Sequence, residues 1–387
     1  WAFIKPEKSA LPDADEDWVR NPIDYFVYAK MAEKSLKPSP EASKEQLLKR
    51  VCLDLTGLPP TLEMQDRFLK DDSPQAYEKI VNELISSKHY GEKMSIQWLD
   101  LARYADSHGY QDDGLRTMWP WRDWVIHSFN TNLPYDKFIT WQIAGDMLPD
   151  ATKEQILASG FNRNHKITQE GGVVPEEYRV EYVADRAITT SKIMMGLTIE
   201  CARCHSHKFD PISHEDFFSF YSFFNNVDED GLIIYGETAP KPNLTIKKAD
   251  IKGELNFVNL PDSINDVTLM VMKESENLRN TYVLNRGSYD SPTIKVNPGT
   301  PQVILPFDYK NNPANRIGLS KWFFNDNNPL TSRVAVNRIW QQFFGVGIVS
   351  TPDDFGSQGS KPINPELLDW LAYTYQNSDE WDTKKFI

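Results

Sequence analysis

Cysteine and basic residues are scarce in this sequence. Three cysteines among 387 residues are too few to staple a disulfide scaffold. Acidic residues outnumber basic ones by 55 to 42, which gives a net charge of −13, and the sequence contains no run of Lys or Arg. We therefore expect no nucleic-acid partner, because phosphate binding requires a concentrated basic surface.

Long apolar runs are also missing. No stretch approaches the roughly 18 residues that predict a transmembrane helix, so we expect no membrane span in this chain. The sequence opens at Trp1 without a Met or a signal peptide, and it closes on "WDTKKFI", which resembles the start of a helix. We therefore expect the natural chain to continue at both ends.

Helical patterns dominate what is present. Between residues 20 and 160, apolar residues recur at helical spacing, and several segments begin at a capping residue or end at Gly, as "SKEQLLKRVCLDLTG" does. Residues 1–230 are predicted to form a helical domain that also carries the densest polar signals. Helical periodicity returns in residues 309–387.

A segment of different character lies between these helical parts. Within residues 231–308, short runs such as "PNLTIKKADI" and "QVILPFD" are broken by Pro, Gly, Asn and Asp. We predict a β-rich domain or insertion there. The expected fold class is mainly α with a smaller β-rich domain or insertion (α+β).

The stretch "CARCHSHKFDP", residues 201–211, holds two of the three cysteines and two of the seven histidines. In covalent haem attachment, two thiols add to the vinyl groups of the porphyrin, a two-residue spacer sets the separation of the sulfurs, and the next histidine binds the iron. The pattern indicates haem c attached at Cys201 and Cys204, with His205 as the axial iron ligand.

Other readings of this motif stay open. A zinc site needs four ligands, and His207 and His214 could complete a Cys2His2 set, although their spacing differs from that of the common zinc fingers. A disulfide, or a pair of free thiols, needs no adjacent histidine. The remaining cysteine, Cys52, has Val51 and Leu53 as neighbours and is predicted to be a small buried hydrophobe.

A haem iron on this motif has a second axial position to fill. His165, in "NRNHKITQEGG", is the first candidate metal ligand, because the two glycines allow the backbone to approach a flat cofactor closely. The common alternative is a loop histidine that bonds to the backbone. His207 is predicted to bond a haem propionate or Asp210 in the outer shell. Met194 and Met195 are predicted to be core residues.

Carboxylates cluster in the segments around His165. Asp106, Glu170 and Asp185 are candidate catalytic acid/base groups in a polar pocket beside the haem. The alternative is a set of solvated or helix-stabilising charges, since "YRVEYVADR" has the spacing of i,i+4 ion pairs. Calcium is a second candidate cofactor, because "DSHGYQDD" and "NNVDEDG" are oxygen-rich, although neither matches the twelve-residue EF-hand loop.

The order of the motifs resembles that of a known family, the planctomycete-type cytochrome c-associated proteins, which are large secreted proteins. The segments that carry the resemblance are "WAFIKP", "NPIDYFV", "RVCLDLTGLPPT", "YGEKMSIQWLDLARYADSHGY", "WPWRDWVI", "QIAGDMLP", "GFNRNHKITQEGG", "EEYRVEYVADR", "CARCHSHKFDPI" and "FFNNV". Later segments, "TYVLNRGSYDSP", "TSRVAVNRIWQQFFGVGIVSTPDDFG" and "NPELLDWLA", resemble the family's C-terminal partner domain, of which residues 309–387 are expected to be the truncated start. One position departs, because the family commonly has His where this chain has Asn364.

The resemblance implies an extracytoplasmic location, in the periplasm or at the cell surface, and haem c chemistry, but it supplies no reaction. We expect an oxidoreductase or electron-transfer component with a redox partner or other subunits, and an extracellular carbohydrate as candidate substrate. The alternative is a cell-surface binding or scaffold component in which the motif is a structural disulfide or metal site. The 11 Trp and 16 Tyr predict an exposed aromatic patch facing a partner chain, a glycan or missing parts of the protein.

Overall fold

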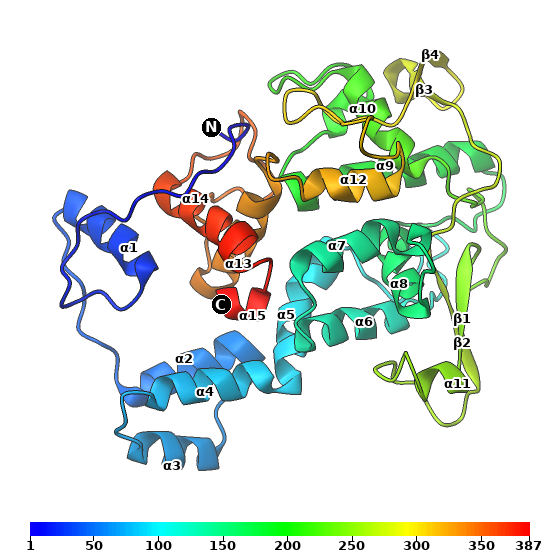
Figure 1. Cartoon of the computed structure of the whole chain (residues 1–387). Helices are drawn as coiled ribbons and strands as arrows, with labels where there is room; N and C mark the ends of the chain where they lie inside the picture. Colours follow the sequence, from blue (N-terminus) through cyan, green and yellow to red (C-terminus); the bar gives the residue numbers. More distant parts are fainter.

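The computed structural model describes all of residues 1–387 and is built mainly from α-helices, as predicted (Figure 1). The helices before the cysteine motif are α1 (Pro22–Glu33), α2 (Lys44–Thr56), α3 (Leu62–Lys70), α4 (Ala76–Ser86), α5 (Lys88–Leu101), α6 (Trp119–Asn130), α7 (Tyr135–Ala144), α8 (Lys153–Ala158) and α9 (Pro175–Met195). Those after it are α10 (His214–Tyr221), α11 (Lys248–Ile251), α12 (Arg316–Phe323), α13 (Thr331–Phe344), α14 (Pro365–Tyr373) and α15 (Thr383–Phe386).

The β-rich segment forms two separate antiparallel hairpins. Their strands are β1 (Asn243–Lys247) paired with β2 (Asp266–Met270), and β3 (Thr281–Leu284) paired with β4 (Pro292–Val296). Buried residues of three strands, Ile246, Leu269 and Val283, belong to the same apolar cluster as the helices. The predicted small β part is therefore present, and it packs on the helical core without forming a core of its own.

Two apolar clusters hold the molecule together. The larger contains 65 buried residues drawn from nearly the whole chain, and the smaller contains 10 residues of the helices α2–α5. Cys52 lies buried in the smaller cluster, and Met194 and Met195 are fully buried in the larger. The sequence-based prediction is confirmed for all three residues.

The two helices beside the cysteine motif have ends that are fixed by local chemistry. α9 starts with Pro175 at its first position and ends at Gly196, whose φ of +59° is the left-handed conformation that favours glycine. α10 starts after Ser213, whose hydroxyl accepts from the backbone N–H of Asp216 while the Asp216 carboxylate accepts from the backbone N–H of Ser213. These ends place the motif in the connection between α9 and α10.

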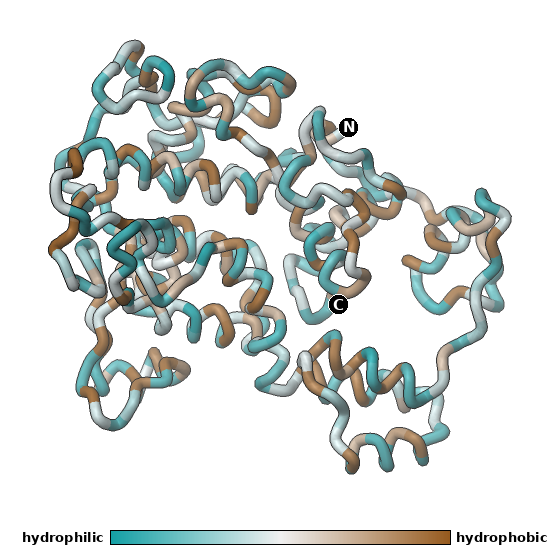
Figure 2. Tube along the Cα trace, turned by 180° about the vertical axis from the view of Figure 1, so that it is seen from behind, coloured by the Kyte–Doolittle hydropathy of each residue, from teal (hydrophilic) through white to brown (hydrophobic).

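Distant parts of the sequence meet at the C-terminal helices, and Figure 1 shows the N-terminal segment beside them. Arg333 of α13 donates to the carbonyl oxygen of Ile4 and to the carboxylate of Asp369 on α14. None of the helices combines the length and apolar character needed to cross a membrane, as predicted. Figure 2 shows that polar and apolar residues alternate along the helices.

Candidate functional site

The cysteine motif forms a single helical turn at the surface. A 3-10 turn spans Glu200–Arg203, and the backbone N–H groups of Cys204 and His205 donate to the carbonyl oxygen of Cys201 at 3.2 and 3.4 Å. Both cysteines are free, and both are exposed, as is His205. Two thiols and an imidazole ring therefore emerge from one turn of chain.

One nitrogen of the His205 ring is held and the other is available. Nδ1 lies 2.7 Å from the carbonyl oxygen of Ser206, which can only accept, so Nδ1 carries the proton. No protein group hydrogen-bonds Nε2. Metal-binding histidines commonly have this arrangement, because the bond from one ring N–H leaves the other lone pair for the metal. The donor chemistry of Cys201, Cys204 and His205 therefore fits a c-type haem.

Arg203, which lies between the two cysteines, connects the turn to three neighbouring elements. Its guanidinium binds both carboxylate oxygens of Glu181 on α9 and lies 3.4 Å from the carbonyl oxygen of Gly287, which follows β3. Its own carbonyl accepts from Nε2 of His214 on α10 at 2.8 Å. The hydrogen bond with Glu181 raises the pKa of the guanidinium. Nothing in the local sequence singles out this residue.

His207 contacts Asp210, one of its two predicted partners. The backbone N–H of Asp210 donates to Nδ1 of His207 at 2.9 Å, and a carboxylate oxygen of Asp210 lies 3.4 Å from the same nitrogen. The other carboxylate oxygen accepts from the backbone N–H of Ser357 at 2.7 Å. This pair therefore connects the segment after the cysteine motif to a loop of the C-terminal part.

His165 lies in the interior of the protein. Its residue is 1% exposed, and its ring stacks on Tyr182 with 4.6 Å between ring centres. Nδ1 donates to the carbonyl oxygen of Lys166 at 2.8 Å, and Nε2 accepts from Arg186 at 2.7 Å. Burial, together with the charges of Arg186 and Arg163, holds the pKa of His165 well below its usual value. Iron ligation by His165 would require breaking its bond with Arg186.

A buried carboxylate, Glu229, is the centre of this network. Arg163 and Arg186 both donate to it, and all three side chains are almost entirely buried. Burial alone would raise the pKa of Glu229, but the charges of Arg186 and Arg163 outweigh burial and lower it. Burial lowers the pKa of Arg163 to about 10 despite its contact with Glu229. Sequence reasoning missed this cluster, because its members are far apart along the chain.

The three candidate acid/base carboxylates all bind groups of one segment, residues 103–111. The contacts are Asp185 with the guanidinium of Arg103, Asp106 with the hydroxyl of Tyr104 at 2.6 Å, and Glu170 with the backbone N–H of Gln111 at 2.6 Å. Burial raises the pKa of Tyr110 to about 12, and Glu181, Asp185 and Glu170 add to the shift. The structure thus brings the three carboxylates around one surface segment, each as a hydrogen-bond acceptor.

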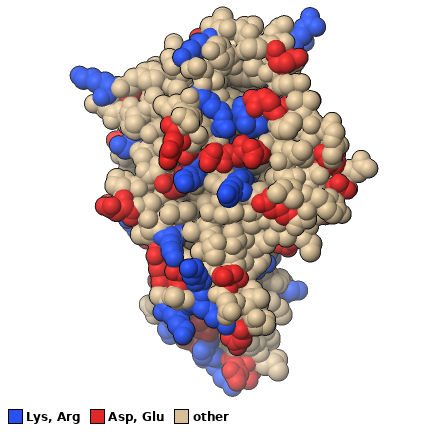
Figure 3. Space-filling view, turned by 90° about the vertical axis from the view of Figure 1, so that its right-hand side faces the viewer, with Lys and Arg blue, Asp and Glu red and all other residues tan.

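The charges of α9 mostly pair outside the helix, which corrects the expected i,i+4 pairs. Glu181 and Asp185 bind Arg203 and Arg103 from other elements, and only Arg179 pairs within the helix, with Glu176 at 2.7 Å. The reason is that α9 lies among other elements, so its side chains meet partners across the fold. Acidic and basic side chains also lie next to one another on the face in Figure 3.

The structure does not bring together the ligands of the zinc site that was considered as an alternative for the motif. No group of three or more His, Cys, Asp or Glu side chains comes close enough to hold a metal ion in this chain. In the Cys2His2 set, Nδ1 of His207 and Nε2 of His214 bind backbone groups instead. The two acidic loops that suggested calcium gather no such group either, so calcium stays a prediction.

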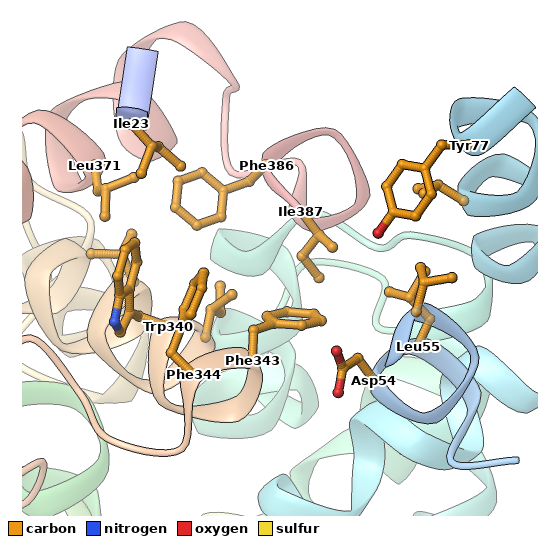
Figure 4. Close-up of a pocket in the computed structure, with 14 residues that line it drawn as sticks. Ile23, Asp54, Leu55, Tyr77, Trp340, Phe343, Phe344, Leu371, Phe386 and Ile387 are labelled. Atoms are coloured by element: carbon orange, nitrogen blue, oxygen red, sulfur yellow. The ribbon is translucent and has the colours of Figure 1, made fainter. Parts of the chain in front are cut away.

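An apolar pocket of about 320 Å³ lies between the N-terminal helices α2 and α4 and the C-terminal helix α13 (Figure 4). Trp340, Phe344 and Phe386 face this space, and the rings of Trp340 and Phe344 stack at 4.1 Å. Its polar atoms come mainly from Asp54 and Tyr77, and burial raises the pKa of Asp54. The aromatic lining consists of one Trp, one Tyr and three Phe, none of which belongs to the cysteine motif, so an aromatic patch that faces a partner stays a prediction.

Two protein families match the parts of the chain that contain most of these elements. The family described as PSCyt2, protein of unknown function (DUF1549), matches residues 22–229, and the family described as PSD1, protein of unknown function (DUF1553), matches residues 315–387. The two matches frame the β-rich segment, and such a pair is typical of planctomycete-type proteins. No curated protein and no solved structure matches the chain. Since the first match spans more than half of the residues and includes the cysteine motif, the chain belongs to the DUF1549 family, whose function is unknown.

Proposed function

We propose that this chain is a c-type haem protein that works outside the cytoplasm as an oxidoreductase or electron-transfer component. The observation that supports the proposal is the surface turn in which two exposed thiols and the available Nε2 of His205 lie within five residues. Family membership alone names no cofactor, so the donor chemistry of this turn carries the argument.

The residues of the turn have separate tasks in this proposal. Cys201 and Cys204 would hold a haem through two thioether bonds, each formed by addition of one thiol to one vinyl group; the thiol proton would pass to the second vinyl carbon, so no electrons would be gained or lost. Ser206 holds the Nδ1 proton of His205, which keeps the Nε2 lone pair directed away from the backbone as an iron donor. Haem bound there would supply a one-electron iron couple.

The framework around the turn supports orientation of a flat cofactor. Arg203 is tied to α9 through Glu181 and to α10 through His214, so the backbone that carries the donors has little freedom to shift. Covalent attachment to such motifs is chemistry of the extracytoplasmic side, which places the proposed protein in the periplasm or at the cell surface. A redox partner and an extracellular substrate, with carbohydrate as the candidate class, belong to the same proposal.

The test is the intact mass and the pyridine haemochrome spectrum of the protein purified from its native host or from a periplasm with haem-attachment machinery. We expect a mass higher than that of the apoprotein by one haem, and its loss in Cys201→Ser/Cys204→Ser. Cys52→Ser is the matched control and should keep the haem, because Cys52 is buried in another cluster. A mass lower by two hydrogens with no porphyrin absorbance would contradict the proposal and favour a scaffold with a structural disulfide.

A further inference from the structure

A polar cavity of about 520 Å³ lies beside the first turn of α10. It is open to solvent and is bounded by residues 211–219 on one side and by residues 295–309, the end of β4 and the loop that follows, on the other. Its volume is within the range of about 300–1,000 Å³ that small-molecule sites occupy. Unlike the pocket of Figure 4, it is lined almost entirely by polar groups.

The first turn of α10 links this cavity to the cysteine motif. His214 faces the motif, since its Nε2 donates to the carbonyl oxygen of Arg203 at 2.8 Å. Its neighbours Ser213 and Glu215 line the cavity. A ligand in the cavity would therefore contact the same first turn of α10 that His214 joins to the segment with the two cysteines.

Several lining groups have no partner within the protein. Glu215, Lys295, Asn297 and Gln302 form no side-chain hydrogen bond or ion pair, and the first two do not pair with each other although both line the cavity. The main chain around them is fixed, because the backbone N–H of Gly299 donates to the carbonyl oxygen of Ser219 on α10 at 3.0 Å. All four residues are exposed, so water serves their polar groups in the free protein, and a ligand with hydroxyl groups can take the place of that water.

The chemistry of these groups narrows the class of ligand. An apolar molecule would leave the polar groups without water or a partner, which is unfavourable. A phosphate-rich anion would meet the carboxylates of Glu215 and Asp216 against the single cation Lys295. A metal ion lacks a set of three close ligands. A neutral ligand dense in groups that both donate and accept hydrogen bonds fits this lining.

We propose that this cavity binds a neutral polyhydroxylated ligand, a short saccharide. The amides of Asn297 and Gln302 each offer two donors and an acceptor to neighbouring hydroxyl groups. Tyr309 supplies an exposed ring at the cavity, and its hydroxyl is held by the carbonyl oxygen of Pro298 at 2.9 Å. The inference rests on the proposed function for the location outside the cytoplasm and gives its candidate carbohydrate class a binding site, but the binding itself needs no haem.

Titration calorimetry of the full chain with neutral tetrasaccharides of glucose, xylose, mannose and galactose tests this inference. We expect one-site binding of at least one of them, weakened at least tenfold in Asn297→Ala/Gln302→Ala. The matched control is Gln75→Ala/Asn82→Ala, one exposed Gln and one exposed Asn beside and on α4 whose side chains also lack partners, and its binding should be unchanged.

Inorganic phosphate and glycine serve as the anionic and zwitterionic probes. Binding of either in place of the saccharides would overturn the proposal, as would the absence of binding by all four saccharides. Equal affinity in the cavity variant and the control would overturn it too. Because haem attachment is read separately from the intact mass, a failure of this site and a failure of the haem proposal give different results.

Discussion

Arg203 donates through both terminal nitrogens of its guanidinium to the two carboxylate oxygens of Glu181, which lies 22 residues earlier on α9. A bidentate pair of this kind constrains orientation as well as distance. Arg203, between the two cysteines, is therefore fixed to α9, the longest helix of the protein. This contact also limits where the thiols on either side of Arg203 can lie.

We predict that Arg203→Lys weakens this attachment, because an ammonium group cannot reproduce the two parallel hydrogen bonds. The coupling free energy between Arg203 and Glu181 should be about 1 kcal/mol, a value reduced by the solvent exposure of the carboxylate. A double-mutant cycle with Glu181→Gln, followed by urea unfolding, measures it. Hydrogen exchange of residues 200–205 should also become faster.

The control for this cycle is the pair Arg67 and Glu83, in which both side chains are more exposed. Its coupling should be smaller. A coupling for Arg203 and Glu181 no larger than that of the control would show that the pair does not hold the motif in place.

The buried network around Glu229 gives a larger predicted effect. Glu229→Gln leaves the guanidinium groups of Arg163 and Arg186 in the interior without a counter-charge, and removing one partner of a buried pair costs about 3–5 kcal/mol of unfolding free energy. Glu33→Gln, which removes an exposed i,i+3 partner of Lys30, should change stability by less than about 0.5 kcal/mol. Chemical unfolding measures the loss of unfolding free energy in both variants, and similar losses would refute the prediction.

The features that could be predicted from the sequence are local ones. The spacing of Cys201, Cys204 and His205 is sufficient to predict a turn with both thiols on it, because only two residues separate the cysteines along the chain. Capping follows the same logic: Ser43 and Gly57 mark the two ends of α2, and the structure has both caps. Burial of Cys52 also follows from its apolar neighbours.

The features that could not be predicted depend on contacts between distant residues. Arg186 and Glu229 are 43 residues apart, and Arg316 and Asp146 are 170 apart, yet both pairs are buried salt bridges. In the sequence such charges are indistinguishable from solvated ones. For the same reason, the loop-like pattern around His165 gave no sign that Arg186, from another segment, would bind its ring.

Asp210 should be required to hold the C-terminal loop against the motif segment. Its carboxylate accepts from the backbone N–H of Ser357 at 2.7 Å, and it is almost completely buried. Asp210→Ala leaves that N–H without a partner, so we expect a loss of about 1–3 kcal/mol and faster hydrogen exchange in residues 353–357. Ser357→Ala is the matched control, because it keeps the backbone donor. Equal effects of the two substitutions would mean that the contact is not responsible.

The stability of the protein should depend on pH through histidines whose pKa is lowered, and the half-buried His127 provides the clearest test. Its ring stacks on Phe257 at 4.2 Å, and burial lowers its pKa below the usual 6.5. The unfolded chain therefore binds this proton at a higher pH than the folded chain does. The contribution of His127 is fully present above about pH 6.5, and it is lost as the pH falls from that value through the lower pKa of the folded protein.

His127→Phe removes the titration and keeps an aromatic ring against Phe257. We expect the variant to lose less unfolding free energy than the natural protein does when the pH is lowered from 8 to 5. The difference between the two proteins should grow by no more than the binding of one proton can contribute. His108 and His165, whose pKa values are also lowered, should preserve a residual slope in the variant. Urea unfolding at both pH values measures the difference. An equal difference at pH 8 and pH 5 would show that the substitution acts through packing alone, and the assigned titration would then be wrong.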